Sequence, residues 1–190
     1  MIYRCFMSKE RASIQYRQLA NTDLHPDLLK DFKRYQEVKQ CWQKKEDKYV
    51  LKEVFYIEDW NQEKRQNIVN LKFNEALNSN GFVFAAYDKE DLVGFATIFG
   101  KASGSLKQYL LLDYLYVSNQ YRHQGIGKEL FLLCVQAAVS LGVSKLYISA
   151  NPAAESQAFY RKIGCVEAEE VIKEIAEELP KDIPMEYQIV

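Results

Sequence analysis

The segment "VSNQYRHQGIGKELF" (residues 117–131) constrains the fold more than any other part of the sequence. It joins a strand-like run, "YLLLDYLYV" (residues 109–117), to a helical pattern whose apolar residues share one face: Leu130, Phe131, Cys134, Val135, Ala138 and Leu141. Gly125 and Gly127 allow close approach of the backbone, and the N–H groups of a helix N-terminus attract an anion. The segment therefore predicts either an anion site or a plain strand-to-helix turn.

Two common phosphate-binding motifs do not match this loop. A dinucleotide fingerprint requires a third glycine at the position of Leu130. A P-loop requires glycine at the position of Arg122 and Ser or Thr at the position of Glu129. What remains is Arg-x-x-Gly-x-Gly between a strand and a helix, in which Arg122 or Lys128 can add positive charge.

The order of elements predicts an α/β fold with a mixed sheet. Strands are expected at residues 13–19, in a hairpin within 38–60, in a second hairpin at 82–87 and 92–99, and at 109–117, 145–150, 165–171 and 185–190. Helices are expected at residues 25–38, at 59–81, directly after the glycine loop, and at 155–164. For the helix at 59–81, the pattern predicts a cap at Asp59, an end at Gly81 and one face formed by Ile68, Leu71, Ala76 and Leu77.

Length and charge narrow the class of protein. The 190 residues predict a single domain, and the net charge of −1 with scattered Lys and Arg argues against nucleic-acid or membrane partners. The longest apolar run, "LFLLCVQAAVSLGV", is shorter than the stretch of about 18 residues that a membrane span needs. The segment "MIYRCFMSKERAS" lacks the pattern of a signal peptide, so we expect a cytoplasmic protein.

Cysteine and histidine spacing argues against a metal site. These residues are far apart and form no CxxC motif: Cys5, Cys41, Cys134, Cys165, His25 and His123. We expect buried, reduced cysteines and no metal. A Cys/His nucleophile is the alternative, but apolar surroundings would raise the thiol pKa.

Residues 109–166 resemble the GNAT superfamily of acyl-CoA-dependent N-acyltransferases. The matching segments are "LYVSNQYRHQGIGK" and, at the expected distance downstream, "LYISANPAAESQAFYRKIGC". The resemblance implies a GNAT fold, with a mixed central sheet of about six to seven strands flanked by about four helices. It also implies acetyl-CoA as cosubstrate, with its pyrophosphate on backbone amides from Gln124 to Lys128. Residues 38–60 form a hairpin-like insert with no counterpart in the minimal family pattern.

The resemblance implies a set of cofactor-binding residues: Leu115, Tyr116, Val117, Arg122, Gln124, Gly125, Ile126, Gly127, Lys128, Asn151 and Ser156. The family often has Asn seven residues before the tyrosine. Here Ala153 stands at that place, and the asparagine lies two residues earlier.

Attack by an amine requires a group that accepts a proton. An amine with a pKa near 10.4 is neutral in only about one molecule in 2,500 at pH 7, a cost of roughly 4.6 kcal/mol. Asp113, on the strand expected beside the thioester, is the first candidate base, with Glu53, Glu58 and Asp59 in the insert as rivals. The alternative is that Asp113 is a half-buried carboxylate held by backbone donors.

The departing thiolate requires a proton donor, and a phenol with a pKa near 10 is well matched to it. In the resembling family the tyrosine at the position of Tyr160 faces the sulfur, which implies a general acid; the alternative is that Phe159 and Tyr160 only pack the helix. A backbone N–H near Val117 would stabilise the oxyanion.

These observations predict an N-acetyltransferase that acts on a primary amine of a small molecule or peptide by direct attack. The alternative is a non-catalytic acyl-CoA-binding module or sensor. Trp42, Phe55, Tyr56 and Trp60 either wall an acceptor pocket or belong to the core. The acidic run at residues 167–182 either attracts amines or is a solvated face. Because proteins of this fold often dimerise, the resemblance also suggests a homodimer.

Overall fold

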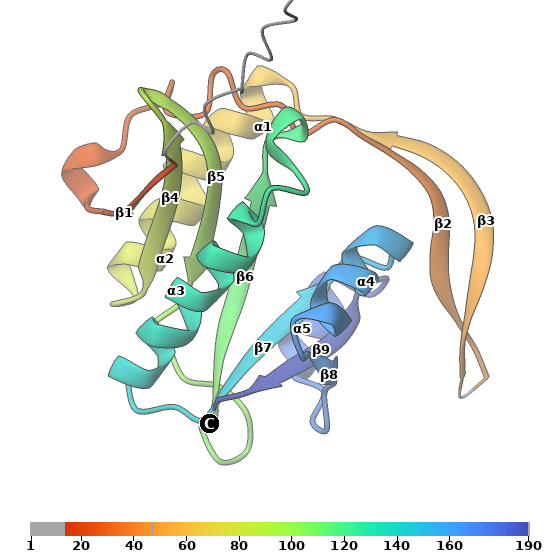
Figure 1. Cartoon of the computed structure of the whole chain (residues 1–190). Helices are drawn as coiled ribbons and strands as arrows, with labels where there is room; N and C mark the ends of the chain where they lie inside the picture. Colours follow the sequence, from red (N-terminus) through yellow and green to blue (C-terminus); the bar gives the residue numbers. More distant parts are fainter. Residues whose placement is uncertain (1–13, 47, 190) are drawn as a thin grey trace, which may run out of the picture.

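The protein is built around a mixed sheet of seven strands in the order β1-β4-β5-β6-β7-β9-β8 (Figure 1). The computed structural model describes residues 14–46 and 48–189. Within them, β6 and β7 are parallel and the other neighbours are antiparallel. The strands are β1 Gln15–Leu19, β4 Phe82–Asp88, β5 Asp91–Ile98, β6 Tyr109–Val117, β7 Lys145–Ala150, β8 Val166–Glu167 and β9 Ile183–Gln188. The predicted mixed α/β fold is confirmed.

Helices cover both faces of the sheet. They are α1 Gln62–Asn67, α2 Asn74–Asn78, α3 Ile126–Ser140, α4 Ala154–Lys162 and α5 Lys173–Glu178. One core lies between α3 and the sheet, and a second lies between the sheet and the segment that contains α1 and α2. None of the helices in the described ranges is long and apolar enough to cross a bilayer.

The helix predicted at residues 25–38 is wrong. Turns closed by hydrogen bonds between residues three apart occupy its first part, and the chain is extended from Gln36 onwards. Phe32 still enters the core. The reason is that Arg34, Gln36 and Val38 are buried in alternation with exposed neighbours, a period of two that a strand provides and a helix does not.

The second predicted helix is present but interrupted by a π-helical segment, Ile68–Phe73. Asn61 caps its start, not Asp59 as predicted. In a π turn residues five apart lie on one face, so both ends of this segment point into the core while Leu71 is 60% exposed. The predicted core position of Leu71 is therefore wrong.

The predicted hairpin within residues 38–60 is confirmed as β2 Gln36–Lys45 and β3 Lys48–Glu58, a separate two-stranded sheet. It stands beside α4 and extends away from the main sheet (Figure 1). Trp42 N–H donates to Pro152 O (2.8 Å), which fastens β2 to the chain after β7. Of the aromatic residues there, Phe55 is exposed, whereas Trp60 packs in the core against Tyr116.

The acidic run contains a helix that the sequence analysis did not predict. Ile172, directly before α5, and Ile175 within it pack against Tyr109 of β6 and Tyr147 of β7, so α5 lies against these two strands. The strand predicted at residues 165–171 shortens to β8, because the chain must turn to begin this helix.

A buried polar cluster joins the ends of β6, β7 and β9. Glu186 is 4% exposed and accepts hydrogen bonds from Tyr109 Oη (2.5 Å) and Lys145 Nζ (2.7 Å). Because an unpaired buried carboxylate is costly, these two donors hold the three strands together at this end.

Cys41, Cys134 and Cys165 are buried free thiols, as predicted, and Cys5 lies outside the described residues. Burial raises the pKa of Cys165 to about 12, which argues against a thiolate nucleophile there. Within residues 14–46 and 48–189 no group of three or more His, Cys, Asp or Glu could hold a metal ion.

Candidate functional site

Strands β6 and β7 pair over only part of their length. Their pairing ends at Leu112 and Ile148; beyond it, residues 113–117 of β6 and residues 149–150 of β7 share no pairs. We call this region the split. β7 turns towards β9, with which it pairs to Ala150, so the two parallel strands separate towards their carboxyl ends.

Backbone groups of β6 point into the split. Ser118 N–H donates to Val93 O of the β5 side (2.8 Å), and in an antiparallel ladder the residues that face the partner alternate. Tyr116 therefore faces β5, whereas the backbone N–H groups of Leu115 and Val117 face the side that β7 has left. They are donors available to a ligand.

A bulge in β6 lies at the closed end of the split. Thr97 pairs with Tyr114 and the next residue of β5 pairs with Leu112, so Asp113 has no paired residue on β5. Tyr114 N–H donates to Thr97 Oγ1 (3.1 Å) at this bulge. Oδ2 of Asp113 is buried with no partner in the described chain, and burial raises the pKa of this carboxyl to about 6.

The glycine loop has the geometry of an anion site. Gly125 has φ +89, and a Cβ there would meet no other atom within 4 Å. The described chain supplies no backbone acceptor for the N–H groups of residues 124–127, as expected at the start of a helix. Four adjacent donors at the positive end of α3 therefore lack a backbone acceptor within the described residues.

Side chains around the loop have different roles. Arg122 is half-buried, and its guanidinium donates to Val117 O (3.2 Å) and Arg34 O (3.1 Å), so it fixes the loop against neighbouring segments. The side chain of Gln124 donates to Gln120 O, and the side chain of Ile126 is buried in the core. Their backbone N–H groups have no backbone acceptor among the described residues. Lys128 is exposed.

Helix α4 forms the other wall. A Cβ on Gly127 would lie 3.4 Å from the ring of Phe159, so α4 packs closely on the first turn of α3. Tyr160 is half-buried, and burial followed by the proximity of Tyr116 raises its pKa above the ordinary value. The phenol is therefore protonated at neutral pH. Ser156 lies half-buried on the same helix.

Asn151 follows β7 at the open end of the split. Its Nδ2 donates to Glu58 Oε1 (3.0 Å), and its Oδ1 accepts from Ala153 N–H (2.9 Å). The predicted cofactor-binding amide is thus already used to join β7 to the hairpin.

An ion pair that the sequence analysis did not predict lies next to Asn151. Arg34 is almost fully buried, pairs with Glu58 and lies 4.8 Å from the centre of the Tyr116 ring. Burial alternates from Arg34 through Gln36 to Val38 in the structure, whereas the residue types at these positions do not indicate that Arg34 faces inwards. Among the rival bases, Glu58 reaches the split, whereas Glu53 and Asp59 are exposed.

Asp182 is a second carboxylate that the sequence analysis did not single out. It precedes β9 and is half-buried. Burial raises its pKa to about 6, and the charge of Glu58 acts in the same direction. A hydrogen bond with Ser149 opposes this shift by lowering the pKa.

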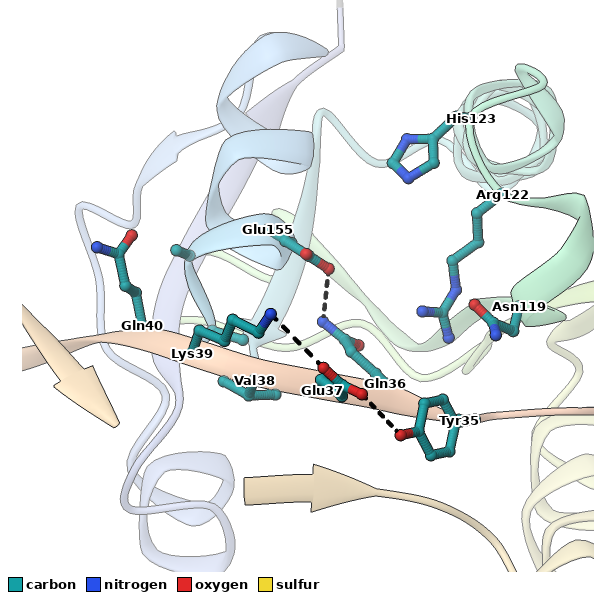
Figure 2. A pocket seen from close by; sticks show the side chains of 12 residues that line it. Tyr35, Gln36, Glu37, Val38, Lys39, Gln40, Asn119, Arg122, His123 and Glu155 are labelled. Atoms are coloured by element: carbon teal, nitrogen blue, oxygen red, sulfur yellow. Dashed lines mark hydrogen bonds and ion pairs between the residues drawn. The ribbon is translucent and has the colours of Figure 1, made fainter. Parts of the chain in front are cut away.

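A cavity of about 380 Å³ lies at the open end of the split. Its lining comes from the loop after β6, from the start of α4 and from β2, which crosses below (Figure 2). In Figure 2 Arg122 and His123 lie on one side, and Glu155 accepts a hydrogen bond from Gln36 (3.0 Å) on the other. The hairpin therefore forms part of a cavity next to the anion loop.

Comparisons with known proteins agree with this arrangement. The model of the acetyltransferase (GNAT) family matches residues 30–165. No curated protein sequence matches the chain.

Solved structures share the fold. A nourseothricin acetyltransferase aligns with a TM-score of 0.68 at 16% identity, over 93% of this chain and 99% of its own. A putative streptothricin acetyltransferase from Bacillus anthracis str. Ames, in complex with acetyl coenzyme A, aligns with 0.66 at 18% identity, over 93% and 97%. An aminoglycoside 6'-N-acetyltransferase complexed with coenzyme A aligns with 0.52 at 20% identity, over 65% and 81%.

Proposed function

The chain belongs to the acetyltransferase (GNAT) family, and we propose that it transfers the acetyl group of acetyl-CoA to a primary amine of a small molecule or peptide by direct attack. The observation that carries this proposal is the split, with free N–H groups at the start of α3 on one side and Tyr160 on the other. Two similar structures contain acetyl-CoA or CoA, which supports the choice of donor.

The residues fit such a cofactor. Its pyrophosphate would accept hydrogen bonds from the N–H groups of residues 124–127, where glycine leaves the space open. The N–H groups of Leu115 and Val117 would contact the part of the cofactor that lies between β6 and β7. When bound, acetyl-CoA supplies a reactive acetyl thioester.

The chain's own residues would then perform three tasks. The N–H of Val117 stabilises the negative charge that develops on the carbonyl oxygen. Tyr160 donates its proton to the departing sulfur. A carboxylate of the split accepts the proton of the amine; Asp113 is the candidate from the sequence, and its pKa of about 6 suits a base that works at neutral pH.

The acceptor is proposed only as a class. The similar proteins include nourseothricin, streptothricin and aminoglycoside acetyltransferases, so these antibiotics are the first compounds to test. The carboxylates Glu58, Asp113 and Asp182 in and beside the split favour a cationic acceptor over an anionic one.

The test measures binding and turnover separately. Calorimetry with acetyl-CoA and CoA reports binding, and release of free thiol with nourseothricin, an aminoglycoside, spermidine and a lysine peptide reports transfer. Binding together with amine-dependent thiol release supports the proposal. Binding without release on any of these amines favours a non-catalytic acyl-CoA sensor, and absence of binding contradicts both.

A further inference from the structure

Asp182 lies at the open end of the split. The residue after it, Ile183, pairs with Ala150, the last residue of β7. Its backbone N–H donates to Leu179 O (3.1 Å), and Ser149 of β7 pairs with Pro184, two residues further along the chain. The strand register thus holds Asp182 beside the place where the strands separate, and interaction with Ser149 lowers the pKa of its carboxyl.

The groups around Asp182 belong to the proposed reaction site. Its charge contributes to raising the pKa of Tyr160 on α4 and that of Tyr116 on β6. Glu58 of β3 is the other charged group that acts on it. In the described chain Glu58 is paired with Arg34, whereas Asp182 forms no ion pair.

Asp113 lies at the opposite end of the split. It follows the last residue of β6 that pairs with β7, and it lies four residue steps along the strand from Val117, a distance of about 13 Å. The charged groups that act on it are Lys72, Glu75, Glu178 and Lys64, which lie near α1, α2 and α5. A general base must reach the proton directly or through one water, so position favours Asp182 over Asp113.

We propose that Asp182 accepts the proton of the attacking amine and that Ser149 positions its carboxylate. This inference rests on the proposed function. As the nitrogen–carbon bond forms and the carbon–sulfur bond breaks, the amine proton passes to Asp182 and the Tyr160 proton passes to sulfur. Solvent then returns a proton from Asp182 to Tyr160, so atoms and charge balance.

The first test is the pH dependence of kcat with the best amine of the panel. In the parent, kcat should fall tenfold per pH unit below about 6, because Asp182 becomes protonated. In the Asp182→Asn variant this decrease of kcat at low pH, the acid limb of the profile, should disappear. Its kcat at pH 8 should be about 100-fold or more below that of the parent, with acetyl-CoA affinity unchanged. Asp113→Asn removes the rival candidate base, and this variant should keep the acid limb.

Ser149→Ala tests the positioning role. Loss of a hydrogen bond to the carboxylate raises the pKa of Asp182, so the acid limb should move to higher pH while the fold is kept. Carbon-13 NMR of labelled aspartate gives a readout without cofactor. Two carboxyl signals, those of Asp113 and Asp182, should titrate near pH 6; the one that vanishes in Asp182→Asn should shift upwards in Ser149→Ala, and the one that vanishes in Asp113→Asn should not.

The outcomes separate the inference from the proposed function. A parent that transfers acetyl groups while Asp182→Asn keeps its acid limb, or stays within about threefold of the parent kcat, contradicts the inference alone. Loss of the limb in Asp113→Asn instead would restore the candidate from the sequence. A parent that transfers no acetyl group to any amine contradicts the proposed function and the inference with it.

Discussion

The side-chain amide of Asn151 donates a 3.0 Å hydrogen bond to Glu58, although the two residues lie 93 positions apart in the sequence. This bond joins the end of β7 to the end of the hairpin. Because Glu58 also pairs with Arg34, one carboxylate links three segments around the open end of the split. The insert is therefore part of the site's framework.

Arg34→Met should destabilise the protein by about 2 to 4 kcal/mol, because it leaves Glu58 partly buried without its cation. Urea unfolding measures the change. The double variant Arg34→Met/Glu58→Gln should recover a large part of this loss. If the two single effects simply add, the pair does not couple these segments.

Gly125→Trp should weaken acetyl-CoA binding at least about tenfold, because the indole would fill the space in front of the free N–H groups. Gly142→Trp is a matched control at the other end of α3. It has a similar positive φ of +74 and equally open surroundings, so it carries the same backbone strain. Calorimetry should show normal binding for this control; equal loss in both variants would indicate a general effect of strain.

Tyr160→Phe should lower kcat by about 10²- to 10⁴-fold, with little change in acetyl-CoA affinity, because it removes a proton donor and keeps the ring. Tyr16→Phe, on β1, is the control and should leave kcat unchanged. Retention of kcat within about threefold, with chemistry shown to limit the rate, would mean that another donor protonates the thiolate.

Asp113→Asn should stabilise the protein at pH 8 by on the order of 1 to 3 kcal/mol. The folded-state pKa of about 6 lies above the usual 3.8, so the native state holds a proton that the unfolded state releases between these values. Stability of the parent should therefore fall as pH rises from about 4 to about 6, and the advantage of the variant should shrink at pH 4. Thermal melts at both pH values measure this; an advantage that does not depend on pH would argue against a buried, titrating Asp113.

The sequence predicted the parts of the fold whose periodicity spans a whole element. The strand–loop–helix unit from Tyr109 to Ser140 and the hairpin of β4 and β5 follow from such patterns. It failed at residues 25–38, where helical spacing of apolar residues competed with the alternating burial of Arg34 and Gln36. In the extended chain Arg34 pairs with Glu58, which lies far away in the sequence. The spacing of residues within 25–38 does not reveal such a distant partner.

The candidate site was predictable only where one segment contains it. The glycine loop is local in sequence, so its free N–H groups follow from the motif. Asp182 reaches the split only because β9 inserts between β7 and β8, an order that the chain's sequence does not display. Its carboxylate sits in the segment "PKDIP", where nothing distinguishes it from the other acidic residues of the run.

The short pairing of β6 with β7 divides the sheet into two parts. One part contains strands β1, β4, β5 and β6, and the other contains β7, β9 and β8. Four residue pairs between β6 and β7 join the two parts directly. The hydrogen bonds among Glu186, Tyr109 and Lys145 connect the two parts at the closed end of the split. At the open end, the hydrogen bond between Asn151 and Glu58 connects β7 to the hairpin. Widening of the split would therefore require one part of the sheet to rotate against the other, and the bond between Glu58 and Asn151 would oppose that rotation.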